Sequence, residues 1–141
     1  AFEKSHSSRV TTVQNAKEGI ERRYDQFLDR AVSAGKVWGL KSRTKNHWCL
    51  ARSLGSGARD VMPFWPDRDA AQACVKNDWA ALVPGAIPLD RFLDKWLPGM
   101  SRDTILVGVH WNEKLVGLEI EPLDLRKDLG ARMGAVKTET G

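Results

Sequence analysis

His47 and Cys49 are the residues whose types and spacing come nearest to a catalytic pair. On a strand, a histidine two positions from a cysteine shares its face, and such a ring can serve as the base for a thiol nucleophile. Side chains at i and i+2 point in parallel rather than toward one another, however, and no third group is placed to orient the histidine. The pair therefore does not predict a thiol enzyme.

Signals for metal and phosphate binding are weaker still. His110 and Glu113 straddle a predicted turn, and Cys49 and Cys74 lie 25 positions apart without a CxxC or CxxH companion. The LGSG run at 54–57 lacks the Lys-Ser/Thr ending of a phosphate-binding loop. We expect no catalytic centre, no metal site and no cofactor, and we expect both cysteines to be buried free thiols.

The positions of the six tryptophans divide them into groups. Trp38, Trp48 and Trp96 fall in predicted strands or on an apolar helix face, which is typical of core residues. Trp65 and Trp79 flank a short predicted helix rich in aspartate, and loop aromatics beside carboxylates are typical of protein-binding surfaces. The alternative is that the aspartates only stabilise the helix start. The predicted partner-binding residues are Trp65, Asp67, Asp69, Asp78 and Trp79.

Charge is distributed unevenly along the chain. Residues 1–59 contain 12 Lys+Arg and 5 Asp+Glu, a balance of +7, whereas residues 60–141 contain 10 and 13, a balance of −3. The acidic half suits a basic protein partner, whose encounter it would accelerate. The basic half, with tryptophans among its cations, instead suits nucleic acid through Lys41, Arg43 and Lys45, although no nucleic-acid-binding motif is present. A solvated strand rim explains the same cations.

Length and composition predict one soluble domain. A chain of 141 residues with 42% hydrophobic and 28% charged residues can bury an ordinary core, which argues against disorder. No apolar run approaches the ~20 residues of a membrane span, and the start does not resemble a secretory signal, so we expect no membrane association and a cytoplasmic location. We predict a flexible N-terminus at 1–10, a domain at 11–129 and a flexible tail at 130–141.

Hydrophobic periodicity predicts an α+β fold: a mostly antiparallel sheet with a long N-terminal helix and three short helices. The long helix spans 11–34 and ends at Gly35. Its apolar face is predicted to consist of Val13, Ala16, Ile20, Tyr24, Phe27, Leu28 and Ala31. Strands are expected at 36–41 and 47–52, paired as a hairpin, and at 60–65, whereas 104–111 and 115–120, joined by a turn at Asn112, should form the sheet's centre. The short helices should begin at Pro66, near Leu89 and at Pro122.

Short motifs that contain tryptophan or proline follow one another along the chain in a characteristic order. They are Val37-Trp38-Gly39-Leu40, Trp48, Met62-Pro63-Phe64-Trp65-Pro66 with Ala70-Ala71, Trp79, Ile87-Pro88-Leu89-Asp90-Arg91-Phe92-Leu93, Trp96-Leu97-Pro98-Gly99 and Leu106-Val107. In these features the chain resembles a bacterial family known as domain of unknown function 2750, over roughly residues 20–129.

That resemblance implies no activity and transfers no catalytic residue. Small domains of similar layout often serve as immunity partners of bacterial toxins, which suggests an inhibitor by analogy. The sequence therefore favours a non-catalytic protein-binding module, in its sharpest form an immunity-type toxin inhibitor, with nucleic-acid binding as the alternative.

Overall fold

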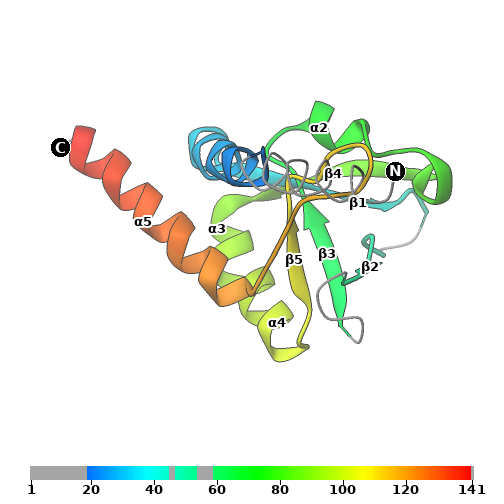
Figure 1. Ribbon diagram of the computed structural model, residues 1–141. Coiled ribbons are helices and arrows are strands. Elements are labelled where there is room, and N and C mark those ends of the chain that lie inside the picture. Colours follow the sequence, from blue (N-terminus) through cyan, green and yellow to red (C-terminus); the bar gives the residue numbers. More distant parts are fainter. Residues whose placement is uncertain (1–18, 45–46, 54–58, 141) are drawn as a thin grey trace, which may run out of the picture.

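The computed structural model describes residues 19–44, 47–53 and 59–140 and confirms a single α+β domain (Figure 1). The expected N-terminus at 1–10 and the first part of the expected long helix, 11–18, lie outside the described residues. Helices pack around two small sheets, with the last helix leaning outward on the left of the view.

The long N-terminal helix (residues 19–34) ends where the sequence predicts. Gly35 adopts a φ of 70°, and its N–H bonds to the Ala31 carbonyl at 2.9 Å. This left-handed conformation strains residues that carry a Cβ, which explains the glycine. The buried side of the helix presents Phe27, Leu28 and Ala31 to the core, so the apolar spacing in the sequence identified its inner face correctly.

The strands form two sheets. In the first, β1 (Lys36–Ser42) pairs antiparallel with β4 (Leu82–Pro88) along its whole length. The second has the order β2-β3-β5-β6. Its strands are β2 (Ala51–Arg52), β3 (Asp60–Phe64), β5 (Leu106–Val109) and β6 (Leu118–Ile120). All pairs are antiparallel except β3 with β5, which run parallel.

Two details of the predicted strand pairing differ in the structure. Segments 36–41 and 47–52 meet antiparallel only at one bridge, between Lys41 and Trp48, and not over their whole length. At this bridge the Cys49 N–H bonds to the Leu40 carbonyl at 2.8 Å and the Ser42 N–H to the His47 carbonyl at 2.9 Å. The reason is that Trp65 takes part of the same edge of β1, where the Trp38 N–H and carbonyl both bond to the Trp65 backbone, so only the end of β1 remains for Trp48. β5 is the fully buried interior strand that its apolar run predicts, but β6 lies at the sheet edge rather than in the centre.

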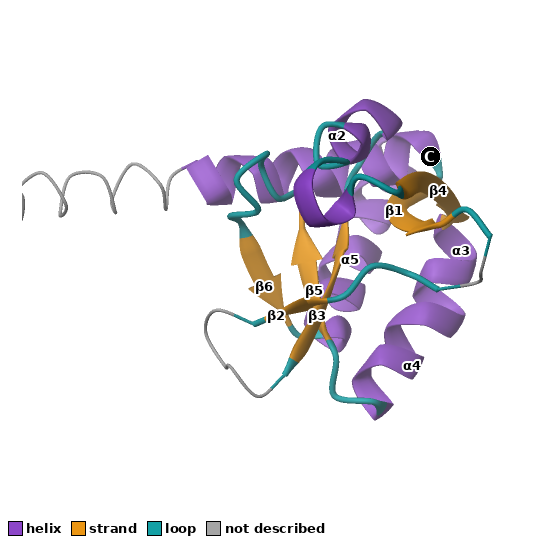
Figure 2. Ribbon diagram, turned by 90° about the vertical axis from the view of Figure 1, so that its right-hand side faces the viewer, coloured by secondary structure: helices purple, strands orange, loops and turns teal. Residues whose placement is uncertain are grey.

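The remaining helices connect and cover these sheets (Figure 2). A short α2 (Arg68–Gln72) precedes the 3-10 turn η1 (Asn77–Trp79), and one continuous helical segment then runs through α3 (Leu89–Arg91), the π-helical η2 (Phe92–Trp96) and α4 (Leu97–Arg102). The last helix, α5 (Pro122–Thr140), is longer than expected, because it includes residues 130–140, which the sequence assigned to a tail. No described helix is both long and apolar enough to cross a bilayer.

Buried side chains gather into two clusters on either side of β3. The larger joins the N-terminal helix, the 89–102 segment and α5, and includes Phe27, Phe64 and Phe92. The smaller includes Trp65, Cys74 and Trp111. This second cluster supports the surface described next.

Candidate functional site

Trp65, the first predicted partner-binding residue, lies in the core. Its side chain is 0% exposed, and its indole Nε1 donates a hydrogen bond to the Trp111 carbonyl at 2.9 Å. Its backbone also bridges to Trp38, at the junction of the two sheets. Trp65 therefore presents no surface to a partner in this structure.

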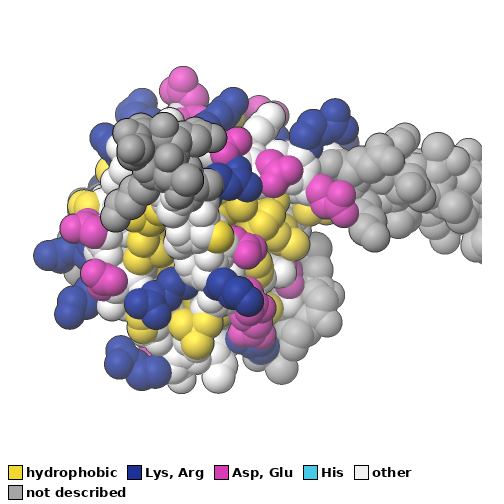
Figure 3. Space-filling model, turned by 90° about the vertical axis from the view of Figure 1, so that its left-hand side faces the viewer, with side chains coloured by type: hydrophobic (Ala, Val, Ile, Leu, Met, Phe, Trp, Pro, Cys, Tyr) yellow, Lys and Arg dark blue, Asp and Glu magenta, His cyan; other side chains and the backbone are white. Residues whose placement is uncertain are grey.

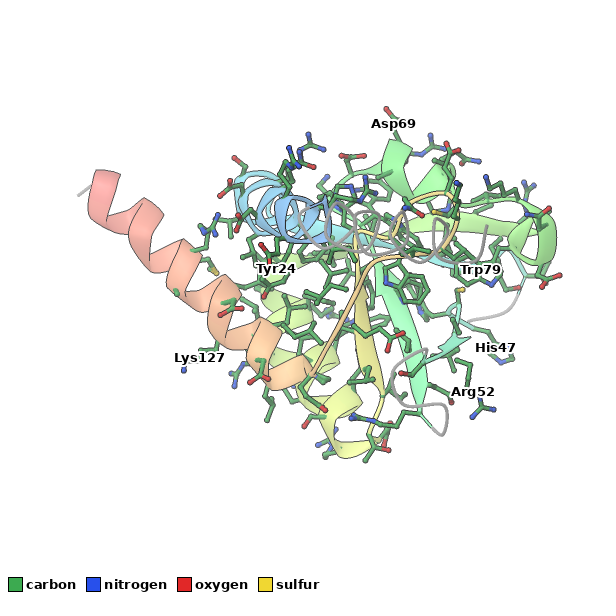
Figure 4. The ribbon with its side chains drawn as sticks, viewed as in Figure 1. Tyr24, His47, Arg52, Asp69, Trp79 and Lys127 are labelled. Atoms are coloured by element: carbon green, nitrogen blue, oxygen red, sulfur yellow. The ribbon has the colours of Figure 1, made fainter. Side chains whose placement is uncertain are left out.

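The two aspartates at α2 have different environments. Asp67 is the N-cap of α2, where its side chain accepts a hydrogen bond from the Ala70 N–H at 2.8 Å, and it also pairs with Arg30 at 3.1 Å. Asp69 is exposed in the first turn and projects outward, away from Trp79 (Figure 4). Asp67 therefore stabilises the start of α2, which is the alternative to a partner-binding role that the sequence left open.

Asp78 and Trp79, in contrast, lie together on a pocket of about 430 Å³. We call it the Trp79 pocket. It brings together η1, the segment before β2 and the turn after β5, three parts of the chain far apart in sequence. The lining residues used below are Leu50, Lys76, Asp78, Trp79, Glu113 and Leu115.

One wall of this pocket is a turn at 112–116 that Asn112 organises. The Asn112 side-chain oxygen accepts hydrogen bonds from the N–H groups of Lys114, at 2.9 Å, and Val116, at 3.2 Å. The Leu115 N–H bonds to the Asn112 carbonyl at 2.9 Å, and the Asn112 N–H bonds to the Val116 carbonyl at 3.0 Å. Four hydrogen bonds thus fix a loop of five residues.

The turn holds apolar side chains in solvent. Leu115 is 37% exposed with a φ of 61°, and Val116 is 41% exposed. A leucine in the left-handed region costs of order 1–3 kcal/mol, and such strained residues cluster at functional sites. Leu50, across the pocket, is 45% exposed. The turn at Asn112 was predicted from the sequence, and asparagine side chains often bond backbone groups two residues on. The exposure of Leu50 and Leu115 was not predicted, because no local pattern sets these two leucines apart from core residues.

Beneath the turn, the Trp111 carbonyl joins several elements. It accepts hydrogen bonds from Arg23 Nη2 at 3.1 Å and from the Trp65 indole, and the Cys74 thiol lies at 3.8 Å. Arg23 also donates from Nε to the His110 carbonyl at 2.7 Å. The N-terminal helix and both tryptophans therefore hold the base of the turn in place.

His110 is buried beside this base, at the edge of a second pocket of about 230 Å³ that shares Cys74 and Glu113 with the Trp79 pocket. Its ring is 4% exposed, and Nδ1 lies 3.1 Å from the Arg23 carbonyl. Because a carbonyl oxygen only accepts, Nδ1 carries a hydrogen. Burial lowers the pKa of His110, and the Arg23 charge lowers it further. The ring is therefore neutral at pH 7.

This burial predicts a pH dependence of folding. The unfolded chain binds a proton near the ordinary pKa of 6.5, which the folded ring takes up only at lower pH. The free energy of unfolding should therefore fall as the pH drops below about 6.5, and level off below the folded pKa. Urea titrations from pH 7.5 to 5 measure the slope. His110→Asn, which tolerates the φ of 50° at this position, should reduce it; an unchanged slope would assign it to other groups.

The two thiols and His47 show no catalytic arrangement in the described part of the chain. Both cysteines are buried and free, as predicted. Burial raises the pKa of Cys49 to about 12 and also raises that of Cys74, so both thiols are protonated and weakly nucleophilic at pH 7. His47 is exposed, whereas Cys49 is 6% exposed. Within the described ranges, no three His, Cys, Asp or Glu side chains are grouped as metal ligands.

Two of the three residues of the nucleic-acid alternative, Lys41 and Arg43, lie in the described part of the chain. Lys41 Nζ lies 5.7 Å from the centre of the Trp48 ring. The centres of the Trp48 and Trp96 rings are 4.9 Å apart, and the two rings pack edge to face. The Trp48 ring is thus engaged within the fold. Arg43 is exposed, and Lys45 lies outside the described residues. Figure 3 shows another face, the left-hand side of the view in Figure 1, where basic side chains are interspersed with acidic and hydrophobic ones.

Comparisons with known proteins identify one family. A family model described as "Protein of unknown function (DUF2750)" matches residues 24–129. Neither curated proteins nor solved structures gave a match to the chain.

Proposed function

We propose that this chain, which belongs to the DUF2750 family, is a non-catalytic protein-binding module that blocks a bacterial toxin by direct contact, as immunity proteins do. The observation that carries the proposal is the turn at 112–116. It displays Leu115 in strained backbone, and Val116, beside the Trp79 pocket. Exposed apolar side chains on strained backbone beside a pocket are typical of binding surfaces.

The composition of the surface favours a protein partner. Exposed leucines and a partly buried tryptophan around a pocket, with charges at its edge, resemble the apolar centre and polar rim of protein interfaces. We place the module in the cytoplasm, because Cys49 and Cys74 are free thiols and extracellular domains of this size usually form disulfides.

Leu115→Asp tests this proposal. Aspartate tolerates a positive φ better than leucine, so the fold should be retained, but a charge replaces the apolar contact. We expect partner affinity to fall about tenfold or more, which is the effect of losing a hot-spot side chain. The chain is purified from its native host with its bound proteins, and the affinity for the captured protein and the neutralisation of its toxicity are measured.

Leu123→Asp provides the matched control. Leu123 is 51% exposed at the start of α5, outside the Trp79 pocket, so its replacement should leave both measurements unchanged. Equal loss in the two variants, or full neutralisation by Leu115→Asp, would contradict the proposal. Copurified nucleic acid whose binding weakens steeply with salt would instead favour the alternative surface at Lys41 and Arg43.

A further inference from the structure

We infer that the Trp79 pocket receives a lysine or arginine side chain of the protein partner. The inference rests on the proposed function, because it assumes that a protein docks on this face. It adds the chemistry of the residue that enters the pocket.

The apolar walls fit the stem of a long basic side chain. Leu50 and Leu115 stand on the pocket with 45% and 37% of their surfaces exposed, and Trp79 supplies an aromatic ring. Lysine and arginine stems bury their methylene groups along such surfaces while the charged head stays near polar groups. The tryptophan ring attracts a cation through its π face.

Two carboxylates are available to the charged head. Asp78 is exposed and, within the part of the chain that the structure describes, forms no ion pair. Glu113 pairs with Lys76 at 3.7 Å, and the two side chains are 67% and 45% exposed. An exposed pair of this length contributes little to stability. Glu113 can therefore turn to an incoming cation at small cost.

The charges also discriminate among occupants. A glutamate or aspartate would meet two carboxylates, Asp78 and Glu113, against the single lysine of the lining, Lys76. A purely apolar side chain would contact the leucines but leave Asp78 without an ion-pair partner.

Short peptides test the pocket without a known partner. The probes are Ac-Gly-Leu-Xaa-Leu-Gly-NH₂ with Xaa as arginine, citrulline or glutamate, titrated into ¹⁵N-labelled protein. The Trp79 indole N–H signal, assigned with Trp79→Phe, is followed. We expect the arginine peptide to bind with a dissociation constant of about 1 mM and at least tenfold more tightly than uncharged citrulline, with weaker binding of glutamate.

Paired variants connect the peptide affinity to the two carboxylates. Asp78→Asn with Glu113→Gln should weaken the arginine peptide about tenfold. Asp94→Asn with Asp103→Asn removes the same charge from exposed positions outside the pocket and should leave binding unchanged. Equal binding of arginine and citrulline, no shift with any peptide, or no effect of the first pair would overturn the inference.

The native partner separates the two proposals. If a captured toxin is released by Leu115→Asp but held equally well by the Asp78→Asn, Glu113→Gln variant, the proposed function stands and the pocket inference fails. If Leu115→Asp has no effect on capture, the proposed function itself fails.

Discussion

Replacing Trp65 by Ala is expected to lower the free energy of unfolding by about 3–5 kcal/mol, the range for deleting a large buried aromatic side chain. Trp65 is fully buried in the cluster with Cys74 and Trp111. Its removal leaves a cavity and takes one hydrogen-bond donor from the Trp111 carbonyl, which keeps its bond to Arg23. The loss is a large share of the 5–15 kcal/mol by which domains of this size are stable.

Urea unfolding of the Trp65→Ala chain provides the measurement. Should this variant fail to fold, Trp65→Phe keeps most of the volume and still loses the indole hydrogen bond, for an expected cost of about 1–2 kcal/mol. Trp79→Ala is the comparison: Trp79 is only partly buried and lines the pocket, so stability should fall less and partner affinity more. If the Trp65→Ala protein were as stable as wild type but no longer bound the partner, the assignment of Trp65 to the core would be wrong and Trp65 would belong to the interface.

The contrast between Trp65 and Trp79 shows what the sequence can reveal about the site. Both tryptophans flank α2 near acidic residues, and nothing in the local pattern separates them. Their burial is decided by the junction of the two sheets, where the Trp65 backbone bridges to Trp38. That contact joins residues 27 positions apart, so the pattern of neighbouring residues cannot predict it.

Features fixed by local periodicity were predicted well. The inner face of the N-terminal helix, its end at Gly35 and the buried β5 follow from spacing, because one residue pattern determines each of them. The pairing of β1 with β4 joins residues that are 40 to 52 positions apart in the sequence, whereas the local pattern predicted only a hairpin with the next segment. The Trp79 pocket likewise comes from three distant segments, of which the sequence indicated only Asp78 and Trp79.

Gly108→Ala is expected to destabilise the protein by about 3 kcal/mol, at the upper end of the range for overpacking a core. Gly108 lies in β5 between β3 and β6. A Cβ at this position would lie 2.6 Å from the Cε2 and Cζ2 atoms of the Trp111 ring. The ring cannot move aside easily, because it is 4% exposed and its Nε1 donates to the Leu118 carbonyl at 3.1 Å.

The same substitution should also disturb the proposed binding surface. Trp111 immediately precedes the 112–116 turn, so a displaced ring shifts Leu115 relative to Leu50 and weakens partner binding as well as the fold. Gly130→Ala is the matched control: a Cβ there meets open space on α5, and the variant should gain up to about 1 kcal/mol because alanine favours helix. Chemical denaturation and partner affinity are measured for both variants. If Gly108→Ala were as stable as wild type, the close packing of Trp111 on β5 would be wrong, and with it the rigid base on which the proposed binding turn depends.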